Sequence, residues 1–335
     1  MKRNILVDQL KGYACFLVLF GHVIRGIRTA GIAIPAFFWG MESFMWSFHV
    51  ALFLFLSGVV YKETGQWRSK QTKGKFLLHK LLNLGVPYVV FSAVYIGMNC
   101  FVGGVNTQFS LRDLLYIWKT PVAQYWYLYA LFFLFCVWTG LSGLLKNWQI
   151  TLLVTLLGYL LPLLGIGLGS FDVVFYSALA FGVGTFVDFS RLTKLPVIAK
   201  CAVVLSHIAA GVLLILAGKI EALGFKECMV LFGIYASIQL ISLAKNCKRI
   251  TRFLLFINQY SLQIYLLHTI FTAGSRIVLQ RLHITQWWIH VVVGTACGLV
   301  FSVLAAMIAE RIKVLNIVFF PTKTYQLLKK KKTIG

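Results

Sequence analysis

The chain has 335 residues, of which 59% are apolar and 12% are charged, and its mean hydropathy is strongly positive. A soluble chain of this length could not bury so much apolar surface, so the composition excludes an ordinary soluble protein and indicates a membrane protein. The formal net charge of +23 does not indicate nucleic-acid binding, because the 32 Lys and Arg residues cluster between apolar runs, as topology-determining charges do.

Apolar runs of transmembrane length follow one another along the chain. A helix needs about 20 residues to cross ~30 Å of hydrocarbon. By this measure we expect an all-α polytopic membrane protein with about ten transmembrane helices. The expected spans are residues 9–27, 38–60, 84–103, 125–145, 150–168, 172–188, 198–218, 228–245, 254–276 and 287–309. The glycine cluster at 165–170 favours a tight hairpin over a phosphate-binding loop, because no strand precedes it and no Lys follows it.

The distribution of basic residues predicts the orientation of these helices. If the N-terminus is cytoplasmic, roughly three of every four Lys and Arg residues fall in cytoplasmic segments. We therefore expect both termini in the cytoplasm. We expect a single transmembrane domain over residues 1–320 and a basic tail over 321–335, whose Lys329 to Lys332 would lie on anionic lipid headgroups. The sizeable external loop is 104–124, where Ser110 begins a short interfacial helix.

Three of the histidines inside expected spans stand out, because ionisable residues there are costly and usually functional. At a rise of ~1.5 Å per residue, His22 lies about 16 Å, His49 roughly 20 Å and His268 roughly 24 Å from the cytoplasmic boundary. Comparable depth on three helices favours a shared polar cavity over three separate core residues. No spacing on any one helix supports a metal site, and the seven scattered cysteines form no CxxC pair, so we expect no metal and no disulfide framework.

Lys11 and His22 are eleven residues apart, which is close to three helical turns, so the two residues share one helix face. A cytoplasmic anion with a long thin arm would suit this spacing, and coenzyme A is such a molecule. Lys11 could hold its phosphates while His22 meets the acyl group. The spacing supports equally well the alternative that Lys11 is a snorkelling interfacial residue and that His22 is unrelated to it.

Four stretches resemble the acyltransferase-3 family of membrane acyltransferases. The segment Asp8-Gln-Leu-Lys-Gly-Tyr-Ala-Cys-Phe-Leu-Val-Leu-Phe-Gly-His22 is similar to the family's opening Asp-x-Leu-Arg-Gly segment, which has its catalytic His eleven residues after the Arg. Phe48-His-Val-Ala-Leu-Phe-Leu-Phe-Leu-Ser-Gly58 resembles the family's second helix. The segment 75–88 resembles its basic loop, and Asn258-Gln-Tyr-Ser-Leu-Gln-Ile-Tyr-Leu-Leu-His268 resembles a late segment. The ten-helix count is also the family's.

The resemblance implies transfer of an acetyl or other short acyl group from cytoplasmic acetyl-CoA to a hydroxyl of an extracytoplasmic or lipid-linked glycan. His22 would be the general base, or the site of an acyl-histidine intermediate. Lys11, Lys75 and Lys80 would bind the donor phosphates. Lys11 stands where the family has arginine, and Lys75 and Lys80 stand where arginines are usual, so point charges replace bidentate guanidinium groups. We expect no appended esterase-like domain of the kind that some relatives carry, so that transfer would be completed within the membrane domain.

On the acceptor side we place Arg25, Glu42, His49, His268 and Trp126. Glu42 precedes His49 by about two turns, and Arg25 is one turn beyond His22. An interfacial ion pair explains Arg25 and Glu42 equally well, and an aromatic belt explains Trp126 without a sugar. His207, His283 and His290 are expected in the core or at the interface.

Two other classes of protein compete with an acyltransferase. A secondary transporter would have a similar topology, although Pro162 has no counterpart in a second half. A non-catalytic membrane module is the other competitor. We expect a multi-pass protein of a bacterial plasma membrane, with a glycan or lipid-linked sugar and membrane lipids as partners and no nucleic acid. The acceptor and the oligomeric state stay open, and a homodimer is one alternative.

Overall fold

The structure is a computed structural model that describes residues 4–65, 70–101, 109–167, 169–220, 225–319 and 321. These residues form helices and no strand, which confirms a helical membrane protein. The chain divides into two compact units. Unit 1 comprises Met1–Val59 and Val187–Ala305, and unit 2 comprises Val60–Phe186 and Ala306–Gly335. The expected tail at 321–335 lies outside the described residues except for residue 321, and the single domain expected over 1–320 stays a prediction.

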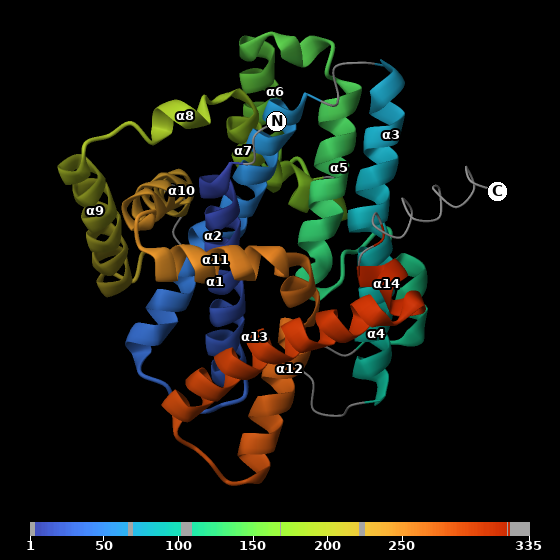
Figure 1. Cartoon of the computed structure of the whole chain (residues 1–335), viewed down its shortest axis with the longest axis vertical. Coiled ribbons are helices and arrows are strands. Elements are labelled where there is room, and N and C mark those ends of the chain that lie inside the picture. The colour runs from blue at the N-terminus through green and yellow to red at the C-terminus, as the bar shows by residue number, and fades with distance from the viewer. Residues whose placement is uncertain are drawn as a thin grey trace. The chain divides into compact units, whose positions relative to one another are not determined.

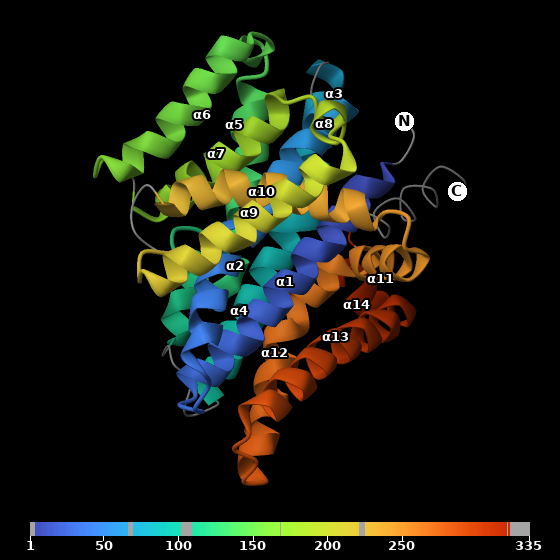
Figure 2. The same cartoon turned by 90° about the vertical axis from the view of Figure 1, so that its left-hand side faces the viewer.

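Unit 1 is organised around α1. It contains α1 (Ile5–Thr29), α2 (Ala36–Thr64) as far as Val59, α8 (Phe189–Leu192), α9 (Val197–Leu216), α10 (Phe225–Ala244), α11 (Lys248–Gln259), α12 (Ser261–Arg281) and α13 (Trp287–Arg311) as far as Ala305. Both α11 and α12 pack on α1, and α9 packs on α10 (Figures 1 and 2). Figure 1 shows α11 lying across α1.

The sequence of α1 explains both where it begins and which side it buries. The side chain of Asn4 accepts a hydrogen bond from the backbone N–H of Val7 at 3.4 Å, which caps the helix at its start. Leu10, Leu19 and Ile24 are completely buried, so this helix lies inside unit 1. The helix begins at Ile5, four residues earlier than the expected span, because the Asn4 cap starts it before the apolar first turn Ile5-Leu6-Val7.

Glycine allows α1 and α11 to approach each other closely. A Cβ atom at Gly12 would overlap the backbone carbonyl of Leu254. Only a residue without a side chain fits this crossing, since a carbonyl group cannot move aside as the end of a flexible side chain can. The Gly12 contact therefore fixes α11 against the segment of α1 that carries Lys11.

The expected span over 254–276 is wrong at its start. The helix is interrupted at Tyr260, whose backbone torsions of −109° and 16° are not helical, and α12 begins at Ser261. The preceding α11 is amphipathic: Leu254 and Ile257 are buried, while its basic first turn is exposed. Counted from Ser261, His268 lies about 11 Å along α12, not 24 Å along one continuous helix.

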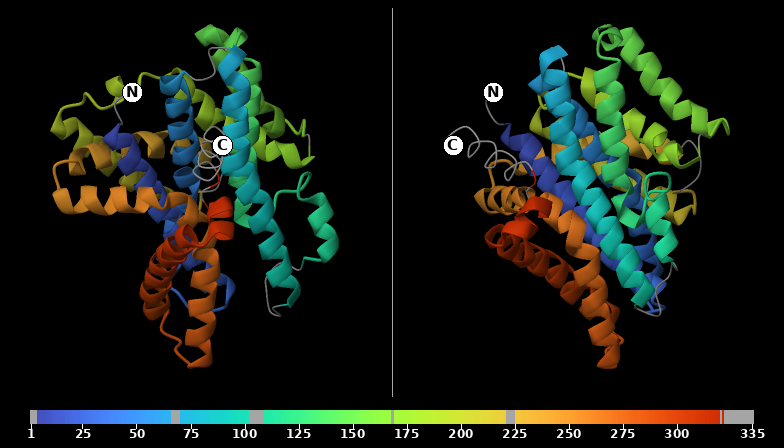
Figure 3. Two further views of the ribbon diagram at one scale, coloured as in Figure 1. Left: turned by 45° about the vertical axis from the view of Figure 1, so that its right-hand side comes forward. Right: turned by 90° about the vertical axis from the view of Figure 1, so that its right-hand side faces the viewer.

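Unit 2 contains the remaining elements. They are α3 (Lys70–Lys80), η1 (Leu81–Gly85), α4 (Val86–Phe101), η2 (Leu111–Tyr116), η3 (Ala123–Tyr125), α5 (Trp126–Gly140), η4 (Leu144–Lys146), α6 (Trp148–Leu163), η5 (Gly169–Phe171), α7 (Asp172–Phe186) and α14 (Lys313–Phe319). Figure 3 shows α3, η1 and α4 running on as one long rod. This rod includes a candidate span over Thr72–Cys100, so the helix expected at 84–103 begins much earlier.

Two expectations about connections in unit 2 are confirmed. Residues 164–171 join α6 to α7, which pack against each other as the two arms of the predicted hairpin. Ser110 caps η2 by accepting a hydrogen bond from the backbone, and the Asp113 carboxylate accepts one from the Ser110 N–H at 2.7 Å. This reciprocal capping box starts the short helix expected at Ser110.

Helices overlie each of the ten expected spans. In the part of the chain that the structure describes, six helices are long and apolar enough to cross a membrane: α1, α2, the rod over Thr72–Cys100, α9, α12 and α13. Three shorter apolar helices lie at Gln149–Leu163, Asp172–Phe186 and Cys228–Ala244. The count of ten membrane crossings and the cytoplasmic location of both termini stay predictions.

Candidate active site

The three histidines singled out in the sequence belong to unit 1, and ring contacts connect them through Trp46 and His22. The ring centroids of His22 on α1 and His268 on α12 are 5.0 Å apart. The Trp46 ring on α2 has its centroid 5.2 Å from that of His22 and 5.2 Å from that of His49. Helix packing therefore places His22 and His268 in direct contact, and Trp46 connects His22 to His49.

The backbone fixes the orientation of two of these imidazoles. The Nδ1 atom of His49 lies 2.6 Å from the carbonyl oxygen of Met45, and Nδ1 of His268 lies 2.9 Å from that of Ile264. A carbonyl can only accept a hydrogen bond, so Nδ1 donates in both residues and the neutral ring keeps its lone pair on Nε2. Both Nε2 atoms are buried and have no hydrogen-bond partner in the described part of the chain.

His22 differs from the other two histidines. Its side chain is half-buried, whereas His49 and His268 are completely buried. Within the described residues its imidazole contacts the rings of Trp46 and His268 and makes no hydrogen bond to protein. Its nitrogen atoms are thus free to exchange a proton with a bound molecule, which is what a general base requires.

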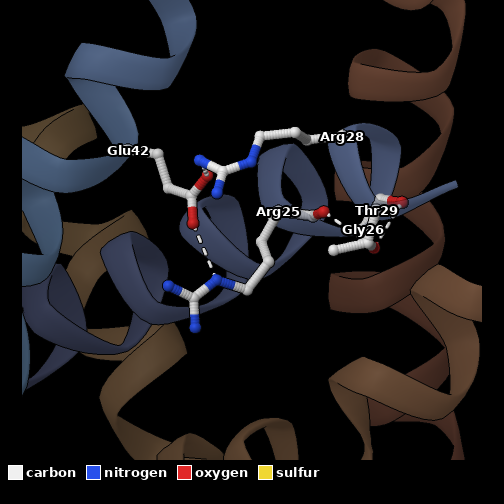
Figure 4. A network of polar contacts seen from close by, with 5 residues as sticks. All are labelled: Arg25, Gly26, Arg28, Thr29 and Glu42. Carbon is white, nitrogen blue, oxygen red and sulfur yellow. Dashed lines mark hydrogen bonds and ion pairs between the residues drawn. The ribbon is translucent and has the colours of Figure 1, made fainter. Parts of the chain in front are cut away.

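Figure 4 shows a charged network formed by Arg25, Arg28 and Glu42. The Glu42 carboxylate on α2 accepts a hydrogen bond from Nε of Arg25 at 2.7 Å, and the Arg28 guanidinium approaches it at 3.5 Å. Glu42 is buried, with 2% of its side chain exposed, whereas Arg25 and Arg28 are 46% and 45% exposed. The guanidinium carbon of Arg25 also lies 3.5 Å from the Trp46 ring centroid, which links the network to the histidines.

The ion pair considered for Arg25 and Glu42 is therefore present. Through the Trp46 ring, Arg25 is connected to His22. Sequence reasoning missed three residues of this region: Arg28, Trp46 and Arg276. Trp46 had a usable signal, because it precedes His49 by three residues and so shares its helix face. Arg276 follows His268 by eight residues, but nothing in the sequence shows which part of α1 its side chain reaches.

The lysines expected to bind the donor occupy both units. Lys11 lies on α1 in unit 1 and is half-buried, on the same uninterrupted helix as His22. Lys75 and Lys80 lie on α3 in unit 2. Lys75 is exposed, and the Lys80 ammonium lies 4.0 Å from the ring centroid of Phe135 and 5.2 Å from that of Phe76. Their role in binding phosphates stays a prediction.

Trp126 starts α5 in unit 2, where its ring meets that of Tyr127 edge-on at 6.4 Å. Both interpretations of this residue, sugar stacking and an interfacial belt, remain open. His207 packs among the rings of Phe44, Phe48 and Phe232, and it is buried as expected of a core residue.

His290 is also buried, and its Nε2 lies 2.8 Å from the carbonyl oxygen of Ile284. His283 is exposed in the turn between α12 and α13. Within the ranges that the structure describes, no group of three or more His, Cys, Asp or Glu side chains is arranged to hold a metal ion.

A family model whose description is acyltransferase domain, that of the acyltransferase-3 family, matches residues 4–307. Comparisons with curated proteins and with solved structures give no match. The matched segment covers nearly the whole chain and includes His22, His49 and His268 with the polar network around them. The chain therefore belongs to the acyltransferase-3 family.

Proposed function

We propose that this membrane acyltransferase transfers an acetyl or other short acyl group from cytoplasmic acyl-CoA to a hydroxyl of an extracytoplasmic or lipid-linked glycan. The observation that carries the proposal is the position of His22. It is a half-buried imidazole without a hydrogen bond among the described residues. It contacts the rings of His268 and Trp46 within the matched acyltransferase domain.

In the proposed reaction, a nitrogen atom of His22 takes the proton of the acceptor hydroxyl as the oxygen attacks the thioester carbonyl carbon. A carbon–oxygen bond forms and the carbon–sulfur bond breaks. The imidazolium then returns the proton to the departing thiolate, so the base is regenerated and the products are an ester and free CoA. An imidazole suits both proton transfers near neutral pH.

The neighbouring residues have supporting roles in this proposal. His268 contacts His22 and is itself held by the carbonyl of Ile264, so it positions the ring of the base. Trp46 contacts the ring of His22 and also lies against the guanidinium of Arg25. Arg25, Glu42 and His49 contribute to the acceptor side.

The proposal assigns the donor phosphates to basic residues. Lys11 is the candidate in unit 1, because it lies about 16 Å along α1 from His22 and shares its face. The flexible pantetheine arm of CoA would lie along this helix between the two residues. Lys75 and Lys80 are candidates in unit 2, and each can be tested by its own substitution.

The decisive experiment measures transfer of radiolabelled acetyl from acetyl-CoA into cell-envelope glycan by membranes that contain the full-length protein. We expect the substitution His22→Ala to lower the rate by roughly 10²- to 10⁴-fold, which is the usual contribution of a general base. His283→Asn is the matched control, since it removes an exposed imidazole at a positive φ of 57°, which asparagine tolerates. Full activity of His22→Ala at normal expression would refute the proposed role of His22.

Two further outcomes separate the competing classes of protein. Uptake of a solute by proteoliposomes without any CoA donor would favour a transporter. Failure of the purified protein to bind acetyl-CoA would favour a non-catalytic module.

A further inference from the structure

Arg276 on α12 lies against α1 close to the proposed base. Its terminal nitrogen occupies the space where a Cβ atom of residue 26 would be, so Gly26 is what allows the guanidinium to approach the helix. Gly26 follows His22 by four residues, which is one helical turn or about 6 Å along the axis. A positive charge therefore lies about one turn from His22, on the side of α1 that faces α12.

This guanidinium is not neutralised by a described residue. Its Nε atom is buried and has no hydrogen-bond partner among the described residues. Arg25 and Arg28, by contrast, share the carboxylate of Glu42. Three guanidinium groups thus surround this end of α1, and within the described ranges one carboxylate lies among them.

An unpaired guanidinium next to a helix in an apolar unit is unfavourable unless something else binds it. Carboxylates and phosphates are the natural partners, because the planar fork of arginine forms two parallel hydrogen bonds with either group. Gly26 adds to this argument: an alanine would favour the helix more, yet it would displace the guanidinium.

We infer that Arg276 binds an anionic group, a carboxylate or a phosphate, on the acceptor that receives the acyl chain. The anion would lie about one helical turn, ~6 Å, from the hydroxyl that reacts at His22. This inference rests on the proposed function and narrows its acceptor to negatively charged glycans. Arg276 is a binding residue in this scheme, and Arg25 and Arg28 contribute charge that Glu42 partly balances.

The test uses full-length protein in phosphatidylcholine nanodiscs and three probes at constant ionic strength: methyl glucuronide, glycerol phosphate and methyl glucoside. Binding is measured from the ligand-dependent shift of the unfolding temperature. We expect at least one of the two anionic probes to bind at least about ten-fold more tightly than the neutral methyl glucoside. A stronger response to glycerol phosphate would identify a phosphate-bearing acceptor, and a stronger response to methyl glucuronide would identify a uronic acid.

The variants locate this preference. Arg276→Gln is expected to reduce it to within about two-fold, and Gly26→Ala to weaken it in the same direction, because the added methyl displaces a guanidinium that keeps its charge. Arg281→Gln is the matched control, an exposed arginine on the same helix, and should keep the full preference. Equal binding of neutral and anionic probes by the unsubstituted protein, an undiminished preference in Arg276→Gln, or an equal loss in Arg281→Gln would overturn the inference.

His22→Ala separates this inference from the proposed function. That variant should keep the preference for anions while losing acyl transfer. Retained transfer in His22→Ala would refute the catalytic proposal and leave anion binding at Arg276 standing. Loss of the preference in Arg276→Gln alone would support the inferred anionic acceptor and would not test the catalytic role of His22.

Discussion

Glu42 holds two arginines of α1 against α2, and one of these arginines lies on the Trp46 ring that contacts His22. A buried carboxylate with two cationic partners is favourable only while those partners stay in place. Glu42 therefore balances the charge of Arg25 and Arg28 and holds Arg25 where its guanidinium contacts Trp46.

We expect Glu42→Gln to lower the free energy of unfolding by about 1–2 kcal/mol, because it leaves two guanidiniums without their carboxylate while solvent screens part of the loss. Denaturant unfolding in mixed micelles measures this change. Glu63→Gln is the control, since Glu63 is an exposed carboxylate in the last turn of the same helix. Equal unfolding free energies for the two variants would show that the ion pairs do not stabilise the unit.

At the residue scale, the sequence predicts the histidines better than their surroundings. His22, His49 and His268 stand out because ionisable residues are rare in apolar runs, and depth along a helix can be counted from basic residues at its end. Arg276 does not stand out, since a basic residue near the end of a span is ordinary, and only the three-residue spacing to His49 marks Trp46. Their role follows from which helices are neighbours, and hydropathy carries no information about that.

At the scale of elements, the contact between α1 and α11 depends on a single missing side chain. The backbone carbonyl of Leu254 occupies the space beside Gly12, so any larger residue must push the two helices apart. The same helix α1 carries the candidate base ten residues further on. Separation of α11 from α1 would therefore disturb the start of the helix on which the proposed chemistry depends.

We expect Gly12→Ala to destabilise the protein by about 1–3 kcal/mol, the usual cost of overpacking, even though alanine favours a helix. The midpoint of thermal unfolding in detergent measures the effect. Gly274→Ala offers the contrast, because a Cβ atom there would meet nothing within 4 Å, and it should be neutral or slightly stabilising. If Gly12→Ala were as stable as Gly274→Ala, the close crossing of α1 and α11 would be wrong.

The break at Tyr260 shows where prediction of elements from sequence reaches its limit. The segment 254–276 is apolar enough to read as one span, but the amphipathic α11 ends and a new helix begins at Ser261. Hydropathy averaged over a window cannot distinguish a continuous helix from two helices that meet at an angle. Because of the break, the distance of His268 from the basic first turn of α11 cannot be counted along one helix axis.

At the scale of the whole molecule, the apolar runs predict the class of protein and the locations of its helices, because a lipid solvent permits few alternatives. The basic clusters predict its orientation, which helix packing does not test. A fusion at the C-terminus measures this orientation directly. We expect green fluorescent protein fused after Gly335 to fluoresce and alkaline phosphatase at the same position to be inactive, as both termini are predicted to be cytoplasmic.

Alkaline phosphatase inserted within the loop 104–124 should be active, since the same rule places that loop outside. An active phosphatase at the C-terminus would contradict the predicted orientation and, with it, the supply of a cytoplasmic donor from the Lys11 end of α1.

The uninterrupted course of α1 from Ile5 to Thr29 has a consequence for the choice of donor. If the donor is held by its phosphates at Lys11 and reacts at His22, the uninterrupted helix sets a distance of about 16 Å between its two ends. A donor would then be selected by its length as well as by its reactivity. Acetyl phosphate is chemically activated but too short to be bound at Lys11 and react at His22. The pantetheine arm of CoA is long enough to span this distance.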